Sequence, residues 1–278
     1  MSLKRRVLFL REFLGFTGGH LKVWHYFCHL LESARFRPEI YLTSRSQLDA
    51  ENPWIANNVP LLRSWNPKPS DIVFLAGLDW MRLPDPSCLA DSRVTIVNLV
   101  QSTRHADSRD PRFAFLRCFA NRICVSEEIR NAVRATGLAN GPMWTVRAAT
   151  DLEAEGQSSF VAPRVTRLLI AGSKNPEFGK RLSDRLTELS ISHCLLTQQL
   201  PRYEFLRAIR ESVACVFLPS LSEGFYLPPL EAMALRTLVI CPDCVGNRGS
   251  CPSTWCTSRD TWFGWTRAQR TTADSRAG

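Results

Sequence analysis

The feature that most constrains the fold is an alternation of short apolar runs with longer, helix-like segments. Between the first two runs, residues 21–34 carry apolar side chains at helical spacing. The short runs are continuously apolar, and such runs predict parallel strands that are covered on both faces. In the first half of the chain, the strands expected on this basis are 6–10, 39–43, 71–77, 93–101 and 121–126, and residues 143–149 end the half.

The alternation stops and then restarts, which predicts two domains. Residues 152–164 are polar and contain Gly, Ser and Pro, so we expect a linker there. The second block predicts helices at 177–189 and 202–212 and strands at 167–172, 193–197, 213–218 and 237–241. The sequence therefore predicts an α/β protein with two Rossmann-like, doubly wound domains. We place these domains at 1–155 and 156–247, with an atypical tail at 248–278. Ligands of such domains bind beyond the carboxyl ends of the strands, so the expected site is an inter-domain cleft.

Composition limits the partners more than the fold. The 278 residues are 45% hydrophobic and carry a formal net charge of +9, which favours phosphates, nucleic acid or anionic membrane surfaces. No run of five Lys or Arg occurs, so a nucleic-acid-binding arm is not expected. No apolar run reaches the ~18 residues of a membrane-spanning helix. Arg11 and Glu12 interrupt the N-terminal apolar run, so we expect a strand in a cytoplasmic protein rather than a signal peptide.

The ten cysteines raise the question of a metal. Most lie inside apolar runs, where they behave as small hydrophobic residues. Four others lie close together near the end of the chain, at Cys241, Cys244, Cys251 and Cys256. Their spacing fits no common zinc module, so reduced thiols are the expectation and a zinc-stabilised interaction protein is the alternative.

The stretch FLPSLSEGFYLPPLEAMAL, residues 217–235, is the richest in chemistry. A loop containing Glu223 and Gly224 follows a predicted strand, and the pair Pro228-Pro229 suits the first turn of a helix. We expect Glu231 in that first turn, near free N–H groups that suit a phosphate. Gly224 has no side chain and would let a ligand approach the backbone. The alternative is a solvated loop acid followed by a carboxylate that only complements the helix dipole.

The segment PSLSEGFYLPPLEAMA resembles the Glu-x7-Glu signature of the family 4 glycosyltransferases. The resemblance extends over residues 5–247 and includes the glycine-rich FLGFTGGH, the basic loop of RLLIAGSKNPEFGKRL and the segment ICVSEEIRNAVRATG. It implies a GT-B fold whose second domain binds a nucleotide-diphosphate sugar. It also implies transfer of the sugar to a hydroxyl acceptor with retention of anomeric configuration.

The resemblance implies roles for residues of the second domain. Glu223, the catalytic candidate, would contact hydroxyls of the donor sugar, and Glu231 would contact the ribose. Lys174 would neutralise the diphosphate, with Lys180 as a second candidate or a solvated helix residue. The amides that would lie against sugar and diphosphate are those of Gly224, Phe225 and Tyr226.

The first domain contributes two further groups. After its strand 93–101, Gln101 or His105 would bond a sugar hydroxyl, with His105 as a catalytic candidate or a plain surface histidine. Gly18 and Gly19 begin the first helix, where they would admit acceptor or diphosphate or else form a tight turn. His20 follows them as a further candidate. The glycine spacing is not the G-x-G-x-x-G of dinucleotide enzymes. Asp-x-Asp does not occur, so we expect neither cofactor nor metal.

The sequence departs from the family in two places. The family usually has a glycine at the turn after EAMA, where this chain has Arg236, which would be strained at positive φ. From 246 to 278 the chain has no Leu, Ile, Val or Met and three of the eight Trp, which resembles translation in a shifted reading frame. On that hypothesis the second domain is incomplete. Comparison of the coding DNA in its three frames tests it, and the absence of a family-like continuation would contradict it.

These observations predict a retaining hexosyltransferase of polysaccharide or glycoconjugate biosynthesis. The alternative is a catalytically impaired, nucleotide-binding remnant of such an enzyme. The basic charge suits a lipid-linked or saccharide acceptor and peripheral association with the inner face of the membrane, and no nucleic-acid partner is expected.

Overall fold

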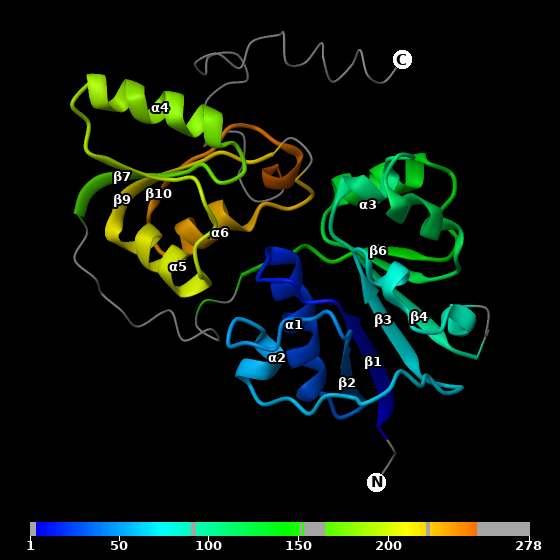
Figure 1. Cartoon of the computed structure of the whole chain (residues 1–278). Helices are drawn as coiled ribbons and strands as arrows, with labels where there is room; N and C mark the ends of the chain where they lie inside the picture. The colour runs from blue at the N-terminus through cyan, green and yellow to red at the C-terminus, as the bar shows by residue number, and fades with distance from the viewer. Residues whose placement is uncertain (1–3, 90–92, 151, 153–164, 221–222, 249–278) are drawn as a thin grey trace. The chain divides into compact units, whose positions relative to one another are not determined.

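The computed structural model describes residues 4–89, 93–150, 152, 165–220 and 223–248 (Figure 1). The chain forms two compact units, and each is described by itself. The first unit comprises Met1–Asp151 together with the short segments Leu200–Leu206 and Ser222–Leu227. The second comprises Leu152–Gln199, Arg207–Leu221 and Pro228–Gly278. The predicted linker from 153 onward, and the predicted tail apart from residue 248, lie outside the described residues.

The first unit is built on a six-stranded parallel sheet in the order β2-β1-β3-β4-β5-β6. Its strands are β1 Arg5–Arg11, β2 Phe36–Leu42, β3 Ile72–Ala76, β4 Thr95–Val100, β5 Asn121–Cys124 and β6 Met143–Thr145. Its helices are α1 Gly18–Leu31, α2 Pro53–Ala56 and α3 Glu127–Ala135, with 3-10 turns η1 Asp79–Arg82, η2 Pro86–Leu89, η3 Thr103–Ala106 and η4 Pro111–Arg117. The order places β1 between β2 and β3, so the topological switch point lies between β1 and β3.

Strand β1 is buried on both of its faces. Val7 and Phe9 join one buried apolar cluster, whereas Leu8 and Leu10 join another. The ring of Phe9 lies 5.2 Å from that of Phe27 in α1 and 4.5 Å from that of Phe74 in β3. Both faces of the strand are therefore covered, as its continuous apolar run predicts.

The second sheet has four parallel strands in the order β10-β9-β7-β8. The elements are β7 Val165–Ala171, α4 Pro176–Glu188, β8 His193–Leu196, α5 Arg202–Glu211, β9 Ser212–Phe217, α6 Leu227–Ala234, β10 Leu238–Ile240 and η5 Val245–Asn247. Its switch point lies between β7 and β9. A small core of Ile170, Val216 and Leu218 packs against α4 and β8.

Helix α3 has sequence signals at both of its ends. The Oγ of Ser126 accepts a hydrogen bond from the N–H of Ile129 at 3.3 Å, which caps the start of the helix. Glu127 and Glu128 occupy its first turn, where the helix dipole favours acidic groups. Gly137 follows the end at φ +66°, a conformation that glycine adopts without strain.

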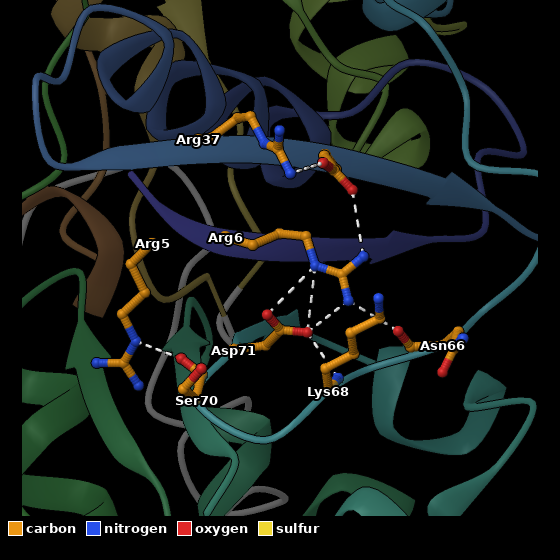
Figure 2. Close-up of polar contacts among 8 residues, drawn as sticks. Arg5, Arg6, Arg37, Asn66, Lys68, Ser70 and Asp71 are labelled. Carbon is orange, nitrogen blue, oxygen red and sulfur yellow. Dashed lines mark hydrogen bonds and ion pairs between the residues drawn. The ribbon is translucent and has the colours of Figure 1, made fainter. Parts of the chain in front are cut away.

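An ionic network fastens the amino ends of the first three strands (Figure 2). The guanidinium of Arg6 in β1 contacts Asp71, just before β3, with an Nη2–Oδ2 distance of 2.5 Å. It also donates to Oε2 of Glu39 in β2 at 3.5 Å and to the carbonyl of Asn66 at 2.9 Å. The N–H of Lys68 donates to the same Asp71 oxygen at 2.6 Å. This network fixes the end of the sheet opposite the switch-point loops.

Candidate functional site

In the second unit, the candidate Lys174 lies near the place where β7 and β9 end. Ala171 pairs with Phe217, so the two strands finish side by side at the switch point. The loop 172–175 leaves β7 with Lys174 exposed, and the segment beginning at Leu218 leaves β9. Open parallel sheets bind ligands at this place, so Lys174 lies where a ligand of the second sheet would bind. Lys180 is exposed on α4.

Two glycines that the sequence analysis did not single out allow α4 to lie close to the sheet. A Cβ on Gly179 would meet the Leu195 side chain at 3.0 Å, and one on Gly172 would meet the same side chain at 3.3 Å. The helix begins at Pro176 after Asn175, whose side chain accepts from the N–H of Phe178 at 3.3 Å. The tight packing holds the start of α4 beside the loop that carries Lys174.

Helix α6 corrects the expected position of Glu231. The helix begins at Leu227, one residue before the proline pair, so Glu231 is its fifth residue and lies beyond the first turn. Pro228 and Pro229 carry no N–H, which also removes two of the amides that the first turn would offer to a phosphate. Glu231 is 1% exposed and is therefore a buried carboxylate in the middle of the helix.

Gly224 has a structural reason for lacking a side chain. It groups with the first unit, where a Cβ would lie 2.4 Å from the carbonyl oxygen of Gln101 and 2.7 Å from the Cα of Ser102. Its carbonyl accepts a bond from Ser126 Oγ at 3.5 Å. The prediction that this glycine opens space for a ligand is therefore wrong on its Cβ side, because protein backbone fills that space.

The neighbours of Gly224 are held in different ways. Phe225 packs against the apolar cluster of the first unit. Tyr226 is buried at 6% exposure, whereas Glu223 is half-buried. The three predicted amide donors thus lie in a segment whose side chains anchor it to the protein.

The turn at Gly18 and Gly19, here called the glycine turn, contacts the residue that follows β4 in the first unit. The side-chain amide of Gln101 donates to the carbonyl of Gly19 at 3.2 Å, and a Cβ on Gly19 would lie 3.5 Å from Gln101 Oε1. Thr17 caps α1 by accepting from the N–H of His20 at 3.2 Å. The structure therefore brings together Gly18, Gly19 and Gln101, three of the predicted residues.

His105 lies after β4 but is 2% exposed rather than on the surface. Its Nδ1 lies 3.0 Å from the carbonyl oxygen of Ser102, so Nδ1 must carry the proton that is donated. Burial lowers the pKa of His105 to about 4, and the nearby Arg112 and Arg122 add to that effect. The surface-histidine alternative is therefore wrong, because the ring is buried.

Two charged groups near the glycine turn escaped the sequence analysis. Arg11 ends β1 and Asp79 begins η1, and their side chains form a buried ion pair with an Nη1–Oδ2 distance of 2.6 Å. Burial raises the pKa of Asp79 to about 6, although Arg11 opposes the rise. The only signal in the sequence is a charged residue at or shortly after the end of an apolar run. Exposed charges also occur at such places, so the signal does not predict a buried ion pair.

The described residues lack a metal cluster and a membrane-spanning helix. Within them, no three His, Cys, Asp or Glu side chains are grouped as a metal site would require. Cys241 is half-buried and Cys244 is buried, whereas Cys251 and Cys256 lie outside the described residues. In the same part of the chain, no helix combines the length and the apolar character needed to cross a membrane.

A sequence comparison bears on the second half of the chain. Residues 147–250 match the family described as Glycosyl transferases group 1. That region contains β7, β9, α6, Lys174, Glu223 and Glu231. No curated protein matches the chain.

Solved structures share the fold over most of the chain. Sucrose-phosphate synthase from Thermosynechococcus elongatus is 12% identical with a TM-score of 0.58, covering 88% of this chain and 83% of that one. The N-terminal domain of Candida albicans trehalose-6-phosphate phosphatase is 10% identical with a TM-score of 0.54, covering 89% and 84% respectively. At these identities the similarity concerns the fold, and it confirms the predicted GT-B class with Rossmann-like sheets.

Proposed function

We propose that the protein is a family 4 retaining glycosyltransferase that moves a hexose from a nucleotide-diphosphate donor to a hydroxyl acceptor. The observation that carries the proposal is the position of Glu231. It is a buried carboxylate on α6, the helix that follows the switch-point strand β9, inside the region that matches the glycosyltransferase family. A desolvated carboxylate makes strong hydrogen bonds to hydroxyl groups, as recognition of a ribose requires.

The other residues take roles that follow from their chemistry. Lys174, exposed at the end of β7, neutralises the leaving diphosphate, and Lys180 is a second cation for it. Glu223 accepts hydrogen bonds from the donor sugar, while the backbone amides of 224–226 contact sugar and diphosphate. A leaving phosphate oxygen can take the proton of the acceptor hydroxyl, so the chemistry needs neither a metal nor a histidine base.

The test is the isosteric change Glu231→Gln, which keeps the volume but removes the charge. We expect kcat/KM for the preferred nucleotide sugar to fall about 10- to 100-fold, the effect of losing a charge-assisted hydrogen bond. The matched control is Glu188→Gln on α4, whose side chain is 63% exposed and paired with Arg185. Turnover is measured with a panel of nucleotide-diphosphate sugars, and circular dichroism checks folding. Unchanged kinetics in the folded Glu231 variant would remove the assignment.

The alternative is a remnant that binds nucleotide without turnover. The strained Arg236, at φ 59° two residues after the end of α6, favours it because strain there weakens the helix that carries Glu231. Titration of a nucleoside diphosphate beside a donor-hydrolysis assay separates the two functions. Binding without hydrolysis or transfer supports the remnant, whereas turnover of any donor contradicts it.

The cellular setting belongs to the same proposal. We place the enzyme in polysaccharide or glycoconjugate biosynthesis, in the cytoplasm or at the inner face of the membrane. The net charge of +9 supports an anionic surface or a lipid-linked acceptor, and a saccharide acceptor is the other option. Flotation with anionic and with neutral vesicles distinguishes these settings.

A further inference from the structure

The inference concerns three polar side chains at the switch point of the first sheet. Arg11 is the last residue of β1, His20 lies in the first turn of α1, and Asp79 opens η1 after β3. Open α/β sheets bind ligands beyond the strands that flank the switch point, which here are β1 and β3. The glycine turn that would admit a substrate leaves β1 at the same end.

Arg11 is held rigidly. Its Nη1 donates to Oδ2 of Asp79 at 2.6 Å and to the carbonyl of Ala76 at 3.3 Å. The N–H of Ala76 donates to the same Asp79 oxygen at 2.8 Å. Both charged groups are therefore fastened to the end of β3, and both are buried.

The other terminal nitrogen of Arg11, Nη2, determines the state of His20. Nη2 lies 2.8 Å from Nδ1 of His20. A guanidinium can only donate, so Nδ1 must accept and the proton of the neutral ring must sit on Nε2. Phe13 packs on the imidazole with a ring distance of 4.8 Å. Within the described residues, Nε2 has no hydrogen-bond partner.

We propose that Arg11 fixes His20 as the Nε2-protonated, neutral imidazole, and that His20 donates this hydrogen bond to a substrate oxygen at the glycine turn. The ligand chemistry is an oxygen acceptor, either of a phosphate or of a sugar hydroxyl. His20 is then a donor and not a general base. The role in substrate binding rests on the proposed glycosyl transfer, whereas the tautomer rests on the geometry alone.

Electrostatics agrees with the geometry. Burial lowers the pKa of His20 to about 3, and the positive charge of Arg11 adds to the effect. The ring therefore stays neutral throughout the physiological pH range. A neutral N–H retains its donor function when the pH changes, unlike an imidazolium.

The chain supplies an internal control for the tautomer. His105 donates from Nδ1 to the Ser102 carbonyl, so it is the opposite neutral tautomer. The full chain has only five histidines, and its ¹⁵N-histidine spectrum is simple enough to assign with His20→Asn and His105→Asn variants. At pH 7 we expect His20 to show a protonated Nε2 and His105 a protonated Nδ1. A cationic or Nδ1-protonated His20 overturns the proposal.

The contact with substrate is tested in the same spectra. Inorganic phosphate, glucose and UDP are added separately, and the exposed His29 in α1 is the control resonance. Movement of the His20 Nε2 proton with phosphate or UDP identifies a phosphate acceptor, and movement with glucose identifies a hydroxyl. No movement with any of the three overturns the contact with substrate.

Kinetics separates donation from simple packing. Asn at position 20 can still accept from Arg11 but lacks the Nε2 donor, whereas Gln offers an amide near the Nε2 position. We expect kcat/KM to fall about tenfold in His20→Asn and to recover in part in His20→Gln, with an unchanged pH profile. Equal loss in both folded variants, or loss of one limb of the pH profile, contradicts the donor role. Absence of turnover in the unmodified chain would instead count against the proposed glycosyl transfer and leave the tautomer intact.

Discussion

At the scale of single residues, Arg122 is a buried cation whose partners are carbonyls. The side chain is 0% exposed, and burial lowers the pKa of its guanidinium. Its two terminal nitrogens donate to five backbone oxygens around the start of β5. The acceptors are the carbonyls of Phe115, Leu116, Cys118, Ala120 and Asn140. One side chain thus shapes the connection between η4 and β5.

Arg122→Met should be strongly destabilising, because it keeps the apolar stem but leaves buried carbonyls without a donor. We expect the free energy of unfolding to fall by about 3–5 kcal/mol, measured by denaturant titration. Arg117→Met, on the exposed side of η4, is the control and should change stability little. A loss below ~1 kcal/mol for Arg122→Met would mean that water replaces the guanidinium.

His105 should make stability depend on pH. The unfolded ring titrates near 6.5, but the folded ring titrates at about 4. Between these values the unfolded chain binds the additional proton, so stability is present above pH 6.5 and is lost as the pH falls towards 4. His105→Asn, which keeps an N–H near Nδ1, should reduce the slope by about one proton, or roughly 1.4 kcal/mol per pH unit.

Urea titrations between pH 4.5 and 7.5 measure the slope for the wild-type chain and the variant. Asp79 contributes with the opposite sign, since its raised pKa lets the folded state bind the proton first, but this contribution cancels between the two proteins. The same substitution at the exposed His29 is the control. Identical slopes for His105→Asn and wild type would contradict the pH dependence.

The sequence identified residue types better than their environments. Gln101 and the glycine pair could be predicted to meet because both follow strands of one parallel sheet. The burial of Arg122 and His105 could not, because arginine and histidine are most often exposed and the carbonyls they bind are not encoded in side chains. For the same reason the sequence predicts that Gly224 makes room for a ligand, whereas in the structure the backbone of Gln101 fills the space next to it.

At the scale of elements, the end of α6 confirms the expected strain. The N–H of Arg236 donates to the carbonyl of Met233 at 2.9 Å, and that of Thr237 to the carbonyl of Ala232 at 2.9 Å. This pair of bonds is a Schellman motif, in which the residue after the helix adopts positive φ. Arg236 takes φ 59° there, and Ser190 takes φ 54° at the corresponding position after α4.

Arg236→Gly should stabilise the protein by relieving a left-handed conformation. We expect the free energy of unfolding to rise by about 1 kcal/mol, which denaturant titration can resolve. Ser190→Gly should act in the same direction, and Gly137→Ala, at the matching position after α3, in the opposite one. Destabilisation by Arg236→Gly would mean that contacts of the arginine side chain outweigh the strain.

Elements were predictable where their apolar runs were long. Every predicted strand is present, although several are shorter than their runs, as for β5 at Asn121–Cys124. The predicted start of α6 is one residue too late, because a proline pair can occupy the first two or the second and third positions of a helix. With the helix starting at Leu227, Glu231 lies beyond the first turn. The 3-10 turns and the four-residue α2 are too short to show a period.

At the scale of the whole molecule, the two blocks of alternation correspond to two parallel sheets. The fold class could be predicted from the sequence, because continuously apolar strands are typical of parallel sheets that are covered on both faces. The strand order did not follow, since neighbouring runs in the sequence need not be neighbours in the sheet. β1 pairs with both β2 and β3, and that branching creates the place where Arg11, His20 and Asp79 meet.

The parallel pairing of both sheets has a consequence for how the chain acquires its structure. No pair of described strands is joined by a hairpin, and even Arg122 and Met143, which are partners across β5 and β6, are 143 − 122 = 21 residues apart. Each pairing must therefore close a long loop before it contributes any stability, which makes the kinetic barrier largely entropic. On such a pathway the helices form before the strand pairs. Until its partner strand arrives, each strand exposes unpaired N–H and C=O groups to neighbouring chains.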